Sequence, residues 1–189
     1  MKIGAMVPQG WRMDLHDIKP EQQWDTIIEA SARIEKLNYA SVWVYDHFHT
    51  VPSPTQDPTF ECWSLMAALS QVTKNVRIGQ MCTCNSYRNP AYLTKVASTI
   101  DSMSGGRLEF AIGAGWYDQE YKAYGYDYPS AGVRLKMLEE ALQIYIAMTT
   151  LKIKHHLKVS TTRLKMQSIS QNLYKNLTLH FGYVVVVKR

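Results

Sequence analysis

Two short segments carry residue types that bind ligands in α/β proteins. The first is the near-continuous apolar run at residues 40–45 (ASVWVY), of the kind found in parallel strands covered on both faces, which ends directly in Asp46 and His47. The second is residues 107–112, where β-forming residues at every second position predict a strand, followed by Gly113 and Gly115. Glycine has no Cβ, so the backbone there is free to approach a flat or anionic ligand. Both segments predict a ligand site at the carboxyl ends of strands, where α/β enzymes bind their ligands.

The elements that position these residues repeat one unit, a strand followed by a helix. Hydrophobic periodicity predicts strands at 2–7, 40–45, 76–82 and 107–112, and helices at 21–37, 60–72, 91–103 and 134–148. Pro90 suits the first position of the third helix. Four strand–helix units in succession predict a parallel sheet and an α/β fold.

Three motifs within these units resemble a known family. SVWVYDHF, RNPAYLTKVASTIDSMSGGRLEFAIGAGW and QEYKAYG occur in this order between residues 41 and 125. They resemble the luciferase-like flavin and deazaflavin oxidoreductases, and most of all the branch that uses the deazaflavin coenzyme F-420. The resemblance covers residues 1 to about 148. Family members are (β/α)8 TIM barrels about twice that length, so the resemblance implies that this chain holds the N-terminal half of such a barrel.

The resemblance also implies a chemistry, hydride transfer at a flat tricyclic ring lying across the barrel mouth. The implied cofactor is coenzyme F-420, with FMN as the alternative. His47 matches the proton donor or acceptor beside the ring, and imidazole titrates near neutrality. Asp46 is expected to orient His47 or to bond the cofactor; the alternative is that it only caps the following segment. Whether the ancestral enzyme reduced a substrate or activated oxygen stays open.

Five further residues match positions that line the cofactor pocket in the family. A non-proline cis peptide often supports the ring after the third strand, and here it is expected near Met81 and Cys82. Gly115, Trp116 and Gln119 match pocket positions after the fourth strand, with a place in the core as the alternative for Trp116.

Two departures from the family limit the choice of substrate. The sugar-phosphate dehydrogenases of the family carry an acid where this chain has Trp116, and a tryptophan where it has Val51. We therefore expect a small-molecule substrate other than a sugar phosphate.

The composition changes at about residue 149. Residues 149–189 hold eight of the 21 Lys and Arg and none of the 16 Asp and Glu, so the remainder has 13 basic and 16 acidic residues, a formal net charge of −3. With a suitable choice of codons, a one-nucleotide shift rereads residues 152–159 (KIKHHLKV) as EDKASFKG, and later segments then match the family order of an acidic loop, a K-P-H segment and a glycine run. We interpret residues 149–189 as a non-homologous tail translated out of frame, and expect the truncated chain to be inactive.

The alternative for this tail is a small basic module that binds nucleic acid through residues 149–189. The sequence argues against it, because the basic residues form no block and have no interleaved aromatic residues.

The remaining features of the sequence concern its cellular location, metal binding and self-association. Three Cys, no signal peptide and no apolar run of bilayer length predict a cytoplasmic protein without a membrane partner. Cys82 and Cys84 lack a matching His or Cys pair, so no metal site is expected. Four strands cannot close a barrel, so open sheet edges are expected to favour self-association.

Overall fold

Strands and helices alternate along the chain in the computed structural model, which describes residues 1–149 and 182–183. The strands of this part are β1 (Gly4–Met6), β2 (Ser41–Val44), β3 (Arg77–Gln80), β4 (Thr83–Cys84), β5 (Leu108–Glu109), β6 (Ala111–Gly113) and β7 (Gly182–Tyr183). The helices are α1 (Pro20–Lys36), α2 (Cys62–Val72), α3 (Pro90–Ser104), α4 (Asp118–Ala123) and α5 (Ala131–Thr149), with a 3-10 turn η1 (Asn85–Tyr87). The predicted α/β class is confirmed.

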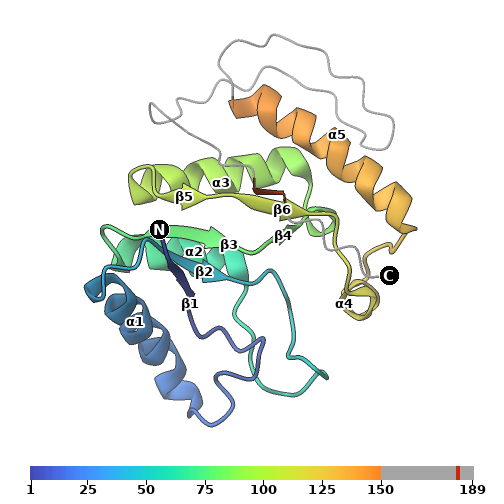
Figure 1. Cartoon of the computed structure of the whole chain (residues 1–189). Coiled ribbons are helices and arrows are strands. Elements are labelled where there is room, and N and C mark those ends of the chain that lie inside the picture. The colour runs from blue at the N-terminus through green and yellow to red at the C-terminus, as the bar shows by residue number, and fades with distance from the viewer. Residues whose placement is uncertain (150–181, 184–189) are drawn as a thin grey trace.

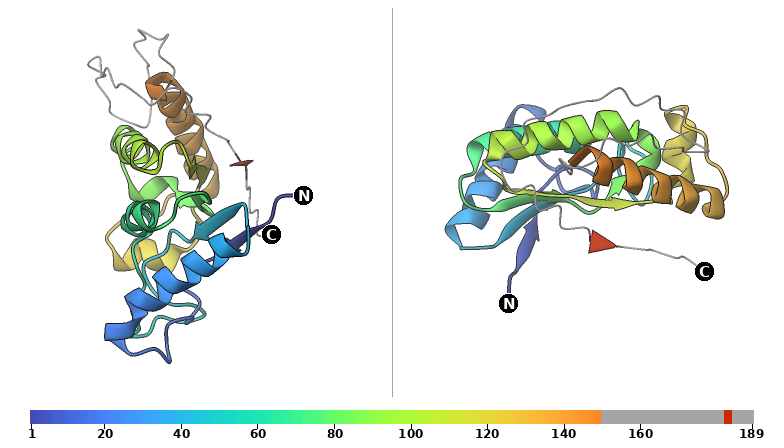
Figure 2. Two further views of the ribbon diagram at one scale, coloured as in Figure 1. Left: turned by 90° about the vertical axis from the view of Figure 1, so that its left-hand side faces the viewer. Right: turned by 90° about the horizontal axis from the view of Figure 1, so that it is seen from above.

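Every strand pairing in the described part is parallel. One sheet has the order β1-β2-β3-β5, with Val42 of β2 opposite Ala5 of β1 and Ile78 of β3, and a second sheet has the order β4-β6-β7. Helices α1, α2, α3 and α5 follow the same order as the strands and lie along one face of them (Figures 1 and 2). The carboxyl ends of all these strands therefore meet at one edge, as parallel strand–helix units require.

The helix boundaries follow from local capping. The Glu61 carboxylate accepts hydrogen bonds from the first N–H groups of α2, and the Asn89 side chain accepts those of Ala91 and Tyr92 at the start of α3. Pro90 occupies the first position of α3, as predicted, and Gly105 ends the helix with a left-handed φ of 67°. No described helix has the length and apolar character that crossing a membrane requires.

The hydrophobic core lies between the sheet and its helices. Alternate strand residues face the helices and are buried, as period-two strands dictate. These are Val42, Val44, Ile78 and Leu108, and together with Phe110, between β5 and β6, they pack on Leu65, Met66, Leu69, Leu93, Ala97 and Ile100 of α2 and α3.

The opposite face of the sheet holds an open hollow of about 450 Å³. Trp43 of β2 lies across it, and its indole N–H donates to Ser41 at 2.8 Å. A Cβ on Gly79 would lie 2.5 Å from the Trp43 ring, and a Cβ on Gly4 would overlap the indole nitrogen. The neighbouring strands β1 and β3 therefore have glycine, at positions 4 and 79, where the ring of Trp43 covers them.

Two strands differ from the predicted ones by an interruption. The predicted strand 76–82 ends at Gln80, and β4 resumes at Thr83 after a cis peptide between Met81 and Cys82, at the expected place. The predicted strand 107–112 is divided into β5 and β6 at Phe110. Most of the basic tail lies outside the described residues, so its interpretation stays a prediction. The strand β7 pairs with β6, while β1 and β5 form the edges of the four-stranded sheet.

Candidate functional site

The candidate site gathers at the carboxyl ends of β2, β3 and β6. His47 follows β2 by three residues, Met81 follows β3 directly, and Gly115 follows β6 by two. Hydrogen bonding keeps the ends of β2 and β3 together, since the N–H of Met81 donates to Val44 O at 2.8 Å. All three residues therefore lie at the carboxyl edge of the parallel strands, where the sequence predicts the site.

His47 is bound at one ring nitrogen by a buried carboxylate. Its Nδ1 lies 2.8 Å from Oε2 of Glu120, on α4, and the Glu120 side chain is fully buried. Glu120 also accepts hydrogen bonds from the backbone N–H of Phe48 at 2.8 Å and from the Tyr87 hydroxyl at 2.9 Å. Burial raises the pKa of Glu120, but these bonds outweigh burial and leave its pKa below the ordinary value of 4.5.

This arrangement decides which nitrogen of His47 is free. An ionised carboxylate only accepts hydrogen bonds, so Nδ1 of His47 must carry the hydrogen that it shares with Glu120. In the described part of the chain, no hydrogen-bond partner contacts Nε2. Nε2 is therefore the atom at which His47 can take up or release a proton.

Aromatic rings enclose the imidazole. Trp11 stacks on it with ring centroids 4.2 Å apart and planes at 3°, while Trp116 and Tyr117 approach edge-on with centroids 6.0 Å away. The His47 side chain is 12% exposed, so the ring keeps a small opening. Sequence reasoning missed Trp11 and Glu120, although Trp11 follows the first predicted strand and Glu120 lies in QEYKAYG, a motif used for the resemblance.

Asp46 faces away from His47. Its carboxylate receives two hydrogen bonds from Arg88, at 2.6 and 2.8 Å, and one from the backbone N–H of Cys84 at 2.8 Å. Asp46 thus contacts Arg88 and Cys62 at the start of α2, whereas His47 bonds Glu120 of α4. The expectation that Asp46 orients His47 is therefore corrected, because Glu120 occupies that position.

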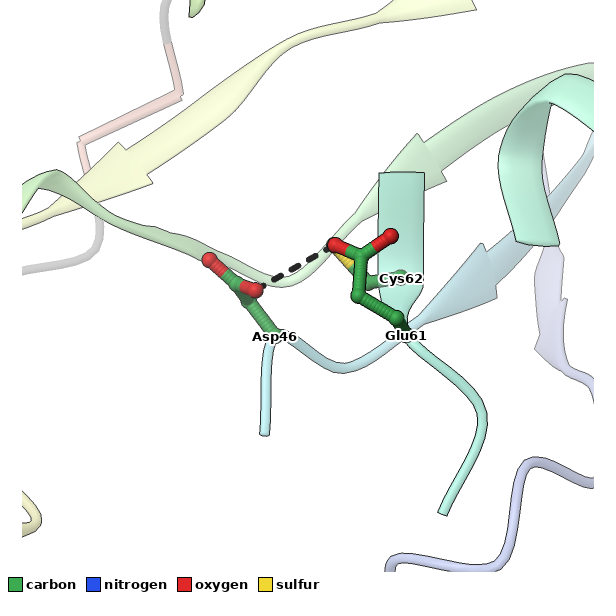
Figure 3. Close-up of side chains that lie close together, drawn as sticks. All are labelled: Asp46, Glu61 and Cys62. Carbon is green, nitrogen blue, oxygen red and sulfur yellow. Dashed lines mark hydrogen bonds between the residues drawn. The ribbon is translucent and has the colours of Figure 1, made fainter. Parts of the chain in front are cut away.

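Asp46, Glu61 and Cys62 offer three atoms that lie within 4.8 Å of one another, as metal ligands do (Figure 3). Arg88 supplies the positive charge at this place, because it bonds Asp46 and also reaches Glu61 at 2.8 Å. Burial raises the pKa of the Cys62 thiol, whose Sγ donates to Asp46 at 3.4 Å. The trio is thus a partly buried cluster around a guanidinium group, which offsets one of its two carboxylate charges.

Gly115 is required by packing within the protein. It has a φ of +80°, and a Cβ would overlap the Tyr121 hydroxyl and lie 2.7 Å from Cys84 Sγ. Tyr121 and Cys84 contact each other at 3.0 Å, and burial raises the pKa of Cys84 to about 12. The glycine therefore admits the Tyr121 side chain beneath the loop, a reason that the sequence analysis did not identify.

The other predicted pocket residues differ in their exposure. Met81 is 46% and Trp116 47% exposed, which excludes the core alternative for Trp116. Cys82 is half-buried, and Gln119 is exposed and accepts a hydrogen bond from Tyr117 at 3.0 Å. Trp116 thus lies beside His47, and Gln119 is exposed at the start of α4.

Comparison with known proteins identifies the family. The model of the luciferase-like monooxygenase family matches residues 1–171. The chain belongs to this family. Among solved structures, an F420-dependent secondary alcohol dehydrogenase in complex with an F420-acetone adduct is 30% identical with a TM-score of 0.63, over 78% of this chain and 41% of that one. An FMN complex of the oxygenating constituent of 3,6-diketocamphane monooxygenase from Pseudomonas putida has 21% identity and a TM-score of 0.62, over 78% of this chain and 39% of that one, and shares the fold.

Two curated relatives also match the chain over only part of their own length. The pyrimidine monooxygenase RutA of Cronobacter turicensis is 30% identical over 130 residues, covering 66% of this chain and 34% of that protein. The F420-dependent glucose-6-phosphate dehydrogenase of Amycolatopsis mediterranei is 28% identical over 142 residues, covering 74% and 40%. The chain therefore spans less than half the length of these relatives, as expected for part of a barrel.

Proposed function

We propose that this chain contributes the ring-facing part of an oxidoreductase site, in which a hydride passes between a small-molecule substrate and coenzyme F-420, with FMN as the alternative cofactor. His47 is the catalytic residue of this proposal and exchanges a proton at Nε2. The observation that carries the proposal is the buried Glu120 carboxylate on Nδ1, at the carboxyl end of β2, which leaves Nε2 without a hydrogen-bond partner among the described residues. Asp46 is assigned to holding that strand end through Arg88.

The residues around the imidazole suit a flat, largely apolar ring. Met81 and Trp116 present half-exposed apolar side chains at the ends of neighbouring strands, as ligand sites of this kind require. The peptide between Met81 and Cys82, together with Gly115 and Gln119, completes the set that would hold the ring. When bound, the cofactor supplies the hydride donor or acceptor.

Proton exchange at Nε2 favours a substrate that interconverts an alcohol and a carbonyl group. Hydride removal from the carbon of an alcohol requires the hydroxyl proton to leave, and the reverse reaction requires a proton at the carbonyl oxygen. The similarity to a secondary alcohol dehydrogenase supports this class. Trp116 and Val51 argue against a sugar phosphate, the substrate named for one relative.

The test joins residues 1–149 to the C-terminal half of the F420-dependent secondary alcohol dehydrogenase and titrates the chimera with coenzyme F-420 and with FMN by fluorescence. We expect binding of one of the two and oxidation of small secondary alcohols. His47→Asn should retain binding and lose turnover, whereas His16→Asn, at an exposed histidine, should retain both. A folded chimera that binds neither cofactor would contradict the proposal.

Further proposals concern the chain as it stands. We place it in the cytoplasm, supported by the free cysteines Cys62, Cys82 and Cys84, and expect it alone to bind neither cofactor and to self-associate through the β1 edge. Fluorescence titration together with the solution mass tests both. We also retain residues 149–189 as an out-of-frame tail, which sequencing of the DNA around codon 148 tests. The competing nucleic-acid module predicts a salt-dependent gel shift with the full chain.

A further inference from the structure

We propose that Trp11 and Glu120 act together as positioning residues that hold His47 in one ring orientation and one tautomer, so that Nε2 alone exchanges a proton. This inference rests on the proposed function for the meaning of that proton. The arrangement of the three side chains stands on contacts made by the protein itself.

Glu120 acts on the Nδ1 edge of the ring. It is reached by three donors, Nδ1 of His47, the N–H of Phe48 and the hydroxyl of Tyr87, at 2.8 to 2.9 Å. Burial raises the pKa of Tyr87, so this hydroxyl keeps its proton and donates it. A carboxylate surrounded by donors has no proton to give, which leaves the hydrogen of the shared bond on Nδ1.

Trp11 acts on one face of the ring. The near-parallel stack at 4.2 Å prevents the imidazole from turning about its Cβ–Cγ bond without losing that contact. The Trp11 side chain is itself only 9% exposed, so the surrounding protein restricts its movement. A 180° rotation of the imidazole would put the carbon Cδ2 in the place of Nδ1 and break the bond to Glu120, so the two contacts support each other.

The segment that carries Trp11 is tied to the strand end that carries His47. The buried amide of Gln9 donates to Tyr45 O and Phe60 O, each at 2.7 Å, and accepts the N–H of Tyr45 at 2.6 Å. The O of Trp11 accepts the N–H of Val51 at 2.8 Å. The loop after β1 and the loop after β2 therefore form one hydrogen-bonded unit, in which Trp11 and His47 keep their relative position.

The charged groups around His47 leave Glu120 as the ionic partner within the described part of the chain. Asp46, the adjacent residue, directs its carboxylate to Arg88. Tyr117 contacts the imidazole ring edge-on. The protonation of Nδ1 thus depends on Glu120 and on no second carboxylate.

The experiment is histidine-selective ¹⁵N NMR of the full chain without any cofactor, because the nitrogen shifts and long-range proton couplings identify the neutral tautomer. His47→Asn assigns the signals. We expect neutral His47 to carry its proton on Nδ1. Glu120→Leu should lose this pattern and Glu120→Gln should give a mixture. Tyr87→Phe removes a hydroxyl that bonds Glu120 and not His47, so it should retain the pattern.

Trp11 is tested by the exchange of the Nδ1 proton with water. Trp11→Ala should accelerate this exchange by about tenfold or more through local opening, and Trp11→Phe should restore the slow rate by keeping a ring on the imidazole. Asp57→Asn is the matched control for the Glu120 variants, because the Asp57 carboxylate makes a similar 2.9 Å contact with Nδ1 of the exposed His16. It should leave the His47 signals unchanged.

Two outcomes would overturn the proposal. One is a wild-type His47 whose neutral form carries the proton on Nε2, a measurement that needs no variant to fold. The other is an unchanged His47 pattern in folded Glu120→Leu. Since no cofactor is present, either outcome is distinct from a failure of cofactor binding in the chimera.

Discussion

Replacing Asp46 with Asn tests the buried charge pair beneath the strand ends. The Asp46 side chain is 1% and that of Arg88 13% exposed, and the carboxylate also accepts the N–H of Cys84. Asparagine removes the negative charge and turns an amide NH₂ towards these donors. Leaving one charge of a buried pair uncompensated costs about 3–5 kcal/mol, so we expect a loss of that size in the free energy of unfolding.

Urea denaturation at pH 7, followed by far-UV circular dichroism, measures this loss. The matched control is Glu61→Gln, which neutralises the other carboxylate on Arg88. Glu61 is 40% exposed, so its ion pair is worth about 0–1 kcal/mol, and Gln retains an acceptor for the start of α2. If Asp46→Asn costs no more than Glu61→Gln at unchanged denaturant slope, the reasoning about the buried pair is refuted.

Three further predictions concern stability. Gly115→Ala should lower the free energy of unfolding in urea by about 2–4 kcal/mol, because strain at positive φ adds to overlap with Tyr121. Gly125→Ala, also at positive φ but in open space, should lower it by about 1–2 kcal/mol. Equal losses would show that the Tyr121 side chain moves aside without cost. Since the pKa of Glu120 is lowered on folding, its contribution is present above about pH 4.5 and is lost as the pH falls through the depressed value. Glu120→Gln should therefore flatten the decline in the free energy of unfolding between about pH 5 and about pH 3. A decline as steep as in the wild type would count against an ionised Glu120. Asn89→Ala should cost about 1 kcal/mol by removing the cap of α3, and thermal unfolding that is unchanged would show that water replaces the cap.

The parts of the fold set by local rules were predictable from the sequence. Asn89, Pro90 and Gly105 mark the ends of α3 through capping and backbone preference, and the structure places the helix between them. The break between β3 and β4 was predictable only through the family resemblance, because no local propensity distinguishes the peptide at Met81 from its neighbours. The interruption at Phe110 depends on how two sheets join, which is a tertiary property.

The site was predictable to the level of the strand end. The residue His47 was identified by its position after an apolar run, but its partner Glu120 lies 73 residues further along the chain. The same pattern made Asp46 look like a partner of His47, because neighbours in sequence were taken as neighbours in space. Their side chains instead have different partners, Arg88 for Asp46 and Glu120 for His47.

The ring of Trp43 has a consequence for how this sheet evolves. One large side chain fills space over three strands, so the glycines at positions 4 and 79 are constrained by a residue on a strand between them. A change at either glycine meets the ring of Trp43, and a smaller residue at 43 removes only part of the obstacle, because a Cβ at position 4 would also lie 2.5 Å from Ser41 Oγ and one at position 79 would lie 2.9 Å from Glu109 Cβ. Substitution of either glycine is therefore expected to require changes at more than one neighbouring position.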